Sequence, residues 1–139
     1  MAPSPFPLMH PTLVARPVHH AGWVYEEKVD GWRMVAIKAK GTVRLLSRKG
    51  NDLTARFPEL AKALGGLKPE TFVLDGEVAV YDRAFVSRIE WLRGRPKDEL
   101  ATLPVYMVFD LLELDGRISA RSRCACGDAC SSACSEATA

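Results

Sequence analysis

A lysine that stands among acids and is followed by an arginine is the feature of this sequence best suited to chemistry. The segment reads Glu26-Glu27-Lys28-Val29-Asp30-Gly31-Trp32-Arg33. A lysine becomes a nucleophile when desolvation, neighbouring cations or a metal ion lower its pKa. Arg33 offers a planar fork of donors that fits phosphate oxygens. The segment therefore indicates either phosphoryl chemistry at Lys28 or a surface hairpin whose charged side chains face water.

Four further blocks follow this segment in the sequence. They are Ser47-Arg48-Lys49-Gly50-Asn51, Phe57-Pro58-Glu59-Leu60, Leu74-Asp75-Gly76-Glu77 and Tyr106-Met107-Val108-Phe109-Asp110. Arg48 can contact phosphate, although an arginine on a half-exposed strand often only solvates it. Glu77 suits Mg²⁺, which takes one or two carboxylates together with phosphates. Phe109 lies in an apolar run, where packing alone would favour a place in the core.

These blocks resemble a known family. Residues 28–33 resemble the KxDGxR signature of the covalent nucleotidyltransferases, which include ATP-dependent DNA ligases, RNA ligases and mRNA capping enzymes. Glu26 matches the ExKxDG form typical of DNA ligases, and the other blocks follow in the family's order. The resemblance covers roughly residues 8–117 and is closest to the short bacterial ligases of end-joining repair.

The resemblance implies roles for the basic residues. Lys28 would attack the α-phosphate of ATP and carry AMP on its side-chain nitrogen. Arg33 and Arg48 would contact the phosphate and ribose parts of the nucleotide.

It also implies roles for the acids and the aromatic residue. Glu26 would lie beside the adenine, and Phe109 would stack on it. Glu77 would hold a ribose hydroxyl or a divalent metal, so that Mg²⁺ joins ATP as a cofactor. Asp30 would orient the lysine or contact DNA.

The function implied is that of an ATP-dependent DNA ligase in DNA repair and recombination. Its partners would be nicked duplex DNA and other end-joining proteins. The family's later EGxVxK-like and KxK-like motifs and its OB-fold domain are not found, so we expect a truncated form that is weakly active or inactive. Two alternatives stay open: a non-catalytic nucleotide- or DNA-binding remnant, and an RNA ligase or capping-type nucleotidyltransferase.

The hydrophobic pattern predicts an α+β fold with antiparallel sheets and packed helices. The resemblance implies an ATP-grasp-like adenylation domain that is incomplete at the C-terminus. The expected strands are residues 23–29, 33–38, 42–47 and 104–112, the last buried on both faces, and two strands around an acidic turn within 71–81. The expected helices are residues 54–64, with Thr54 as N-cap, and 87–93.

The chain divides into an extended lead-in (1–22), a partial adenylation domain (23–117) and a tail (118–139) that we expect to be disordered. His10, His19 and His20 are interpreted as surface residues of the lead-in. Residues 119–139 hold all four cysteines and no large apolar residue. The spacing of these cysteines resembles no standard zinc site. A shift of reading frame is the favoured explanation of the tail, with a natural low-complexity tail as the alternative.

Bulk composition narrows the class of protein. Among 139 residues, 47% are hydrophobic and 26% charged, and the formal net charge is +2. These values are ordinary for a soluble globular domain and exclude a histone-like basic tail. No apolar run approaches the length of a membrane span, so we expect no membrane partner and a cytoplasmic location.

Overall fold

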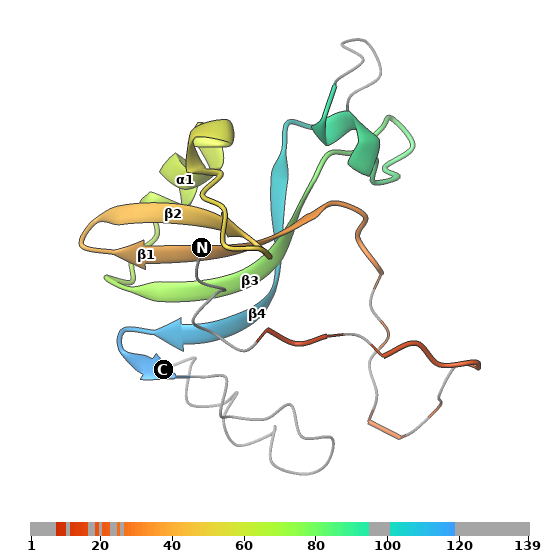
Figure 1. Cartoon of the computed structure of the whole chain (residues 1–139), viewed down its shortest axis with the longest axis horizontal. Coiled ribbons are helices and arrows are strands. Elements are labelled where there is room, and N and C mark those ends of the chain that lie inside the picture. The colour runs from red at the N-terminus through yellow and green to blue at the C-terminus, as the bar shows by residue number, and fades with distance from the viewer. Residues whose placement is uncertain are drawn as a thin grey trace.

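The computed structural model describes residues 8–10, 12–16, 19, 21–22, 25, 27–94 and 101–118. Its centre is an antiparallel five-stranded sheet with the strand order β2-β1-β3-β4-β5 (Figure 1). The strands are β1 (Trp32–Ala39), β2 (Thr42–Ser47), β3 (Phe72–Ala79), β4 (Val105–Leu114) and β5 (Arg117–Ile118). The helical elements are η1 (Thr54–Arg56), α1 (Pro58–Gly65) and η2 (Ile89–Leu92). The expected antiparallel sheet is thus confirmed, with few helices.

The β1–β2 hairpin follows the sequence pattern closely. Lys40 and Gly41 both adopt positive φ, at 51° and 73°, which is the conformation that a tight hairpin turn requires. The predicted turn and the strand 42–47 are confirmed. The expected strand 23–29 is wrong over residues 27–29, which form no strand, because β1 begins only at Trp32, where it pairs with Val78.

The acidic turn expected within residues 71–81 is wrong. Asp75, Gly76 and Glu77 lie inside the single strand β3, which pairs with β1 on one side and β4 on the other. Gly76 serves close approach rather than a turn. A Cβ there would lie 2.6 Å from the Met107 carbonyl oxygen and 2.7 Å from the Tyr106 ring.

The helix expected over residues 54–64 is split, and Thr54 does not cap α1. Proline lacks an N–H and restricts the residue before it, so Phe57 leaves the helical region and α1 begins at Pro58. The Thr54 hydroxyl instead accepts a hydrogen bond from the Leu45 N–H at 2.9 Å. The predicted end at Gly65 and Gly66 is confirmed.

Two other expectations need correction. The helix expected over residues 87–93 is a shorter 3-10 turn, η2. β4 is not buried on both faces: the exposed fractions of Met107, Val108 and Phe109 are 43%, 47% and 47%. The apolar composition predicted the strand, but it could not show which side chains of the strand are left uncovered by other elements.

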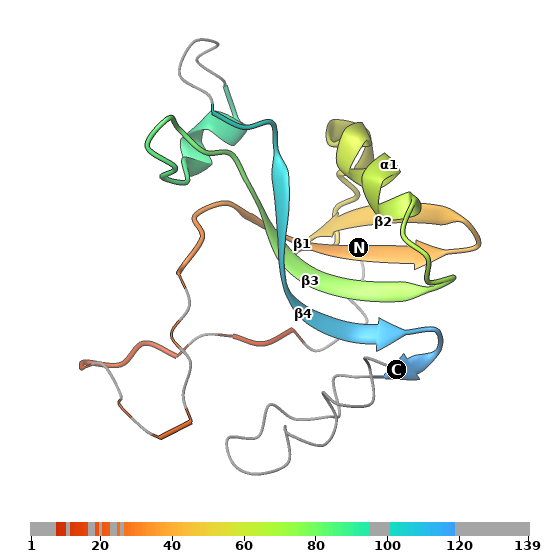
Figure 2. The same ribbon diagram turned by 180° about the vertical axis from the view of Figure 1, so that it is seen from behind.

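The sheet has two different faces. One face carries the main core, in which Met34, Leu45, Phe72 and Val78 are buried and the apolar side of α1 packs. α1 lies beside β2, and the far ends of β3 and β4 extend to carry η2 (Figure 2). Lys38 joins β1 to the end of α1, because its Nζ donates to the carbonyl oxygens of Gly65 and Leu67, at 3.0 and 2.6 Å.

The opposite face has a small cluster of Val35, Val73 and Leu112, on which Leu8 of the lead-in packs. Beyond this cluster, toward the start of β1, that face carries Arg33 and Glu77, which are paired across the strands. The fold thus uses one face for its core and leaves the other for a site. The tail from residue 119, including its cysteines, lies outside the described residues, and no helix within the described ranges is long and apolar enough to cross a membrane.

The close packing around Gly76 gives a stability prediction. Gly76→Ala should lower the free energy of unfolding by about 1–3 kcal/mol, the usual cost of overpacking, because both neighbours of the new methyl group belong to β4. Gly94→Ala is the matched control, since a Cβ there meets nothing within 4 Å. Urea denaturation of both variants measures the difference, and equal stabilities would contradict the packing described.

Candidate functional site

An open cleft of about 910 Å³ lies at the start of β1, on the face away from the main core. The residues that line it come from the lead-in and from all of β1 to β4 or the segments next to them. They are Met9, His10, Glu27, Lys28, Val29, Arg33, Arg48, Glu77, Tyr81, Met107, Val108 and Phe109. Five side chains singled out in the sequence are therefore brought to one place.

Lys28 stands at the rim of the cleft, just before β1. Its side chain is 87% exposed, and its Nζ lies 3.9 Å from Oδ1 of Asp30. The chain passes so close to β3 at Gly31 that a Cβ there would collide with the carbonyl oxygen of Val78. Glycine is therefore required at this position, and the close approach fixes the segment that carries the lysine.

Glu77 is the acid that faces this segment. Its carboxylate accepts a hydrogen bond from the backbone N–H of Gly31 and lies near the charges of Lys28 and Arg33. Burial nevertheless outweighs these effects and raises the pKa of Glu77 above its ordinary value. The site therefore holds a half-buried carboxylate next to a lysine and an arginine.

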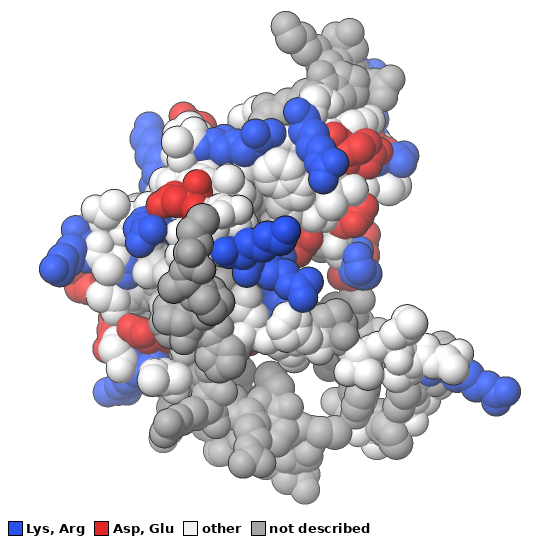
Figure 3. All heavy atoms as spheres, viewed as in Figure 1, with Lys and Arg blue, Asp and Glu red and all other residues white. Residues whose placement is uncertain are grey.

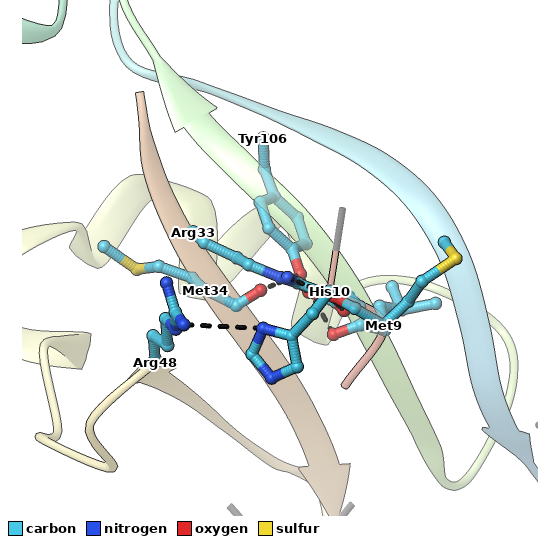
Figure 4. A network of polar contacts seen from close by, with 8 residues as sticks. Met9, His10, Arg33, Met34, Arg48 and Tyr106 are labelled. Atoms are coloured by element: carbon cyan, nitrogen blue, oxygen red, sulfur yellow. Dashed lines mark hydrogen bonds and ion pairs between the residues drawn. The ribbon is translucent and has the colours of Figure 1, made fainter. Parts of the chain in front are cut away.

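Arg33 and Asp75 form a two-pronged ion pair under the cleft. Nε and Nη2 of Arg33 donate to Oδ1 and Oδ2 of Asp75 at 3.0 and 2.6 Å. Nη1 donates to the carbonyl oxygen of Met9 at 2.6 Å (Figure 4). The hydrogen bond to Asp75 raises the pKa of Arg33 above its ordinary value. Every nitrogen of this guanidinium thus donates to a protein oxygen, so the side chain links β1 to β3 and to the lead-in.

Phe109 lies over this ion pair. The Arg33 Cζ is 5.5 Å from the centre of the Phe109 ring, a distance typical of a cation–π contact. Phe109 is 47% exposed, so it is not a core residue. An aromatic ring that is backed by a guanidinium and otherwise open to the cleft can stack on a planar ligand.

Arg48 enters the cleft from the turn after β2. Gly50 in this turn has a φ of 80°, and the Ser47 hydroxyl accepts a hydrogen bond from the Asn51 N–H at 3.0 Å. The Arg48 Nη2 lies 3.4 Å from Nδ1 of His10 in the lead-in. Among the described residues, no carboxylate forms an ion pair with Arg48.

The remaining predicted site residues are placed differently. Asp30 stands beside Lys28 but does not line the cleft. Glu26 lies outside the described residues. Within the described ranges, no group of three or more His, Cys, Asp or Glu side chains could hold a metal ion by itself. Glu77 alone still fits Mg²⁺, because this ion commonly takes one protein carboxylate together with phosphate oxygens.

Sequence reasoning missed Met9, His10 and Asp75. Asp75 stood inside a quoted block, and its position two residues before Glu77 on the same strand could have placed it on the same face. Met9 takes part through its backbone, which no sequence pattern shows. His10 was interpreted as a surface residue, and only the path of the lead-in brings it to the cleft.

Comparison with known proteins identifies the class. A family model described as ATP dependent DNA ligase domain matches residues 9–123, and the chain belongs to this family. It is 40% identical over 95 residues to the multifunctional non-homologous end joining DNA repair protein LigD of Mycobacterium tuberculosis. The aligned residues cover 68% of this chain and 12% of that protein. It is 39% identical over 89 residues to LigD of Pseudomonas aeruginosa, covering 64% of this chain and 11% of that one.

Solved structures agree with this family. The ligase domain of M. tuberculosis LigD is similar with a TM-score of 0.56 and 38% identity, over 67% of this chain and 30% of that one. A mycobacterial DNA ligase D complexed with ATP and MES gives a TM-score of 0.57 and 37% identity over the same shares. The chain therefore spans about an eighth of these whole proteins and under a third of the solved domains.

The buried ion pair predicts that a single substitution at Asp75 strongly lowers the free energy of unfolding. Asp75→Asn should lower the free energy of unfolding by about 3–5 kcal/mol, because it leaves the Arg33 charge without its anion in a site where the side chains are 16% and 1% exposed. Arg44→Gln is the control, since it breaks the exposed Arg44–Asp52 pair, which should contribute about 0–1 kcal/mol. Similar losses in both variants, measured by urea denaturation, would contradict the role of the buried pair.

Glu77 predicts a pH dependence. Because its pKa is raised in the folded chain, the ionised form is favoured less there than in the unfolded chain. Its contribution to stability is therefore present below the ordinary carboxyl range and is lost as the pH rises through the raised value. Glu77→Gln should remove this loss, so the variant gains stability relative to the parent as the pH rises. Stability curves that stay parallel across the acid range would contradict the shift.

Proposed function

We propose that this chain is the nucleotide-binding front part of the adenylation domain of an ATP-dependent DNA ligase for end-joining repair. The domain would have the ATP-grasp-like nucleotidyltransferase fold and work in the cytoplasm. The observation that supports this most is the meeting of Lys28, Arg48, Glu77 and Phe109 at one cleft. These residues come from four distant blocks of the sequence, and each side-chain type can interact with a part of a bound nucleotide or of its metal ion.

In the proposed reaction, Nζ of Lys28 attacks the α-phosphorus of ATP. A phosphorus–nitrogen bond forms, and the bond from this phosphorus to the bridging oxygen breaks. Pyrophosphate leaves with the electron pair, and the amine gives up a proton to solvent. In the next step an oxygen of the 5′-phosphate at a DNA nick attacks the same phosphorus and forms a phosphorus–oxygen bond. The phosphorus–nitrogen bond breaks, the Lys28 amine leaves with the electron pair and takes up a proton from solvent, and AMP is thereby transferred to the DNA end.

The other cleft residues would bind and orient the nucleotide. Phe109 would stack on the adenine, and Glu26 would lie beside it. Arg48 would contact phosphate or ribose oxygens, and Glu77 would hold a ribose hydroxyl or a bound Mg²⁺, which when present neutralises phosphate charge.

Arg33 and Asp30 have less direct parts in this proposal. Arg33, held by Asp75, would support Phe109 and add positive charge near the phosphates, rather than grip a phosphate as a fork. Asp30 would orient Lys28 or meet the DNA.

One face of the molecule carries basic side chains that suit a nucleic-acid partner. Lys and Arg side chains gather in the middle and upper part of the face seen in Figure 3, with acids between them. Phosphate contacts of such side chains supply most of the sequence-independent affinity for DNA. Nicked duplex DNA is therefore the proposed partner, and further end-joining proteins are proposed only by analogy with the relatives.

Two other functions compete with this proposal. A non-catalytic nucleotide-binding remnant would keep the cleft and not the reaction, and the 87% exposure of the Lys28 side chain favours considering it. An RNA ligase or capping-type enzyme would share the cleft and differ in substrate. Mass spectrometry distinguishes the non-catalytic remnant from an enzyme, because only an enzyme gains a covalent AMP. Activity on nicked DNA compared with nicked RNA distinguishes a DNA ligase from the RNA ligase or capping-type enzyme.

Incubation with ATP and Mg²⁺ tests the proposal. We expect slow addition of one AMP to Lys28, detected by intact-mass and peptide mass spectrometry, and no sealing of a nick by this chain alone. Stabilising a transferring phosphoryl group takes positioned charges in closed surroundings, and each missing group commonly costs about 10²–10³-fold in rate.

Lys28→Arg should abolish the adduct, whereas Lys68→Arg, an exposed lysine outside the cleft, should not. An adduct on another lysine would overturn the assignment of Lys28. Efficient sealing of nicked duplex would show that the described cleft needs no further groups.

A further inference from the structure

The lead-in is attached to the site by contacts of three successive residues. Leu8 packs on the cluster of Val35, Val73 and Leu112. The carbonyl oxygen of Met9 accepts the hydrogen bond from Arg33. His10 then lines the cleft and contacts Arg48 (Figure 4). A partly buried apolar anchor and a short charge-assisted hydrogen bond thus hold the segment that carries His10 in register.

The contact with Arg48 determines which ring nitrogen of a neutral His10 carries the proton. A guanidinium has donors only, so Arg48 must donate to Nδ1 of the imidazole. In the neutral imidazole the proton then sits on Nε2, which becomes a second donor beside Arg48. Neither side chain has a carboxylate partner among the described residues. A pair of donors that line a cleft without a carboxylate partner is suited to an anionic oxygen.

We propose that His10 is a further nucleotide-binding residue, which together with Arg48 forms a subsite for a phosphate oxygen of the nucleotide. Arg48 supplies the charge and polarises the imidazole, and His10 donates from Nε2. The inference rests on the proposed nucleotide-binding function and adds to it a residue from the lead-in. It also explains why a polar side chain stands next to a segment that is otherwise attached by apolar and backbone contacts.

Calorimetric titration of the whole chain with ATP and with adenosine tests the subsite. His10→Ala should weaken ATP binding about tenfold, the usual effect of losing a hydrogen bond to a charged group, and leave adenosine binding unchanged. His10→Gln places an amide donor near the position of Nε2 and should keep most of the affinity. His10→Asn can accept from Arg48, but its shorter side chain does not place a donor at the position of Nε2, so it should behave like the alanine variant.

His19→Gln is the matched control, because His19 belongs to the lead-in but contacts Tyr25 at 2.8 Å rather than the cleft. Unchanged ATP binding in His10→Ala, or equal losses for ATP and adenosine, would overturn the subsite while the proposed function stands. If the parent chain binds neither ATP nor adenosine, both the function and the subsite are overturned.

Discussion

The buried ion pair between Arg33 and Asp75 is the interaction on which the site depends. A fully buried carboxylate is costly unless a cation and hydrogen bonds compensate it, and the fork of Arg33 does both. The same guanidinium holds the Met9 carbonyl and lies under the Phe109 ring. One pair therefore joins β1, β3, β4 and the lead-in, so that a change at Asp75 should reach the walls of the cleft that these elements form.

The division of the sheet into two faces explains why polar groups can gather there. The main core and α1 occupy one face and provide most of the buried apolar surface. Among the described residues, the other face has a smaller cluster of three buried residues, which leaves room for a cleft. Gly31 lets the segment before β1 come close to β3, and Gly76 lets β3 come close to β4, where a side chain would collide. The glycine after each aspartate thus places the adjacent charged residues at fixed positions rather than making a turn.

The sequence predicted local features better than long-range ones. The β1–β2 hairpin has a clear alternation and a Lys-Gly turn, and the structure agrees with both. Asp75-Gly76 was interpreted as a turn because Asp-Gly usually is one, and only the partners on both sides show a continuous strand. The meeting of Lys28, Arg48, Glu77 and Phe109 was expected from the family resemblance, while Asp75 and His10 depend on contacts between distant segments. Their roles toward a nucleotide stay predictions.

We infer that four distant blocks of this sequence form one nucleotide site, which the Arg33–Asp75 pair holds together. The most direct measurement is heteronuclear NMR of the labelled chain during titration with ATP. Resonance shifts are expected to concentrate at Lys28, Arg48, Glu77 and Phe109 and to leave α1 on the opposite face unchanged. Shifts that concentrate on the α1 face, or that touch only one of the four blocks, would contradict this inference.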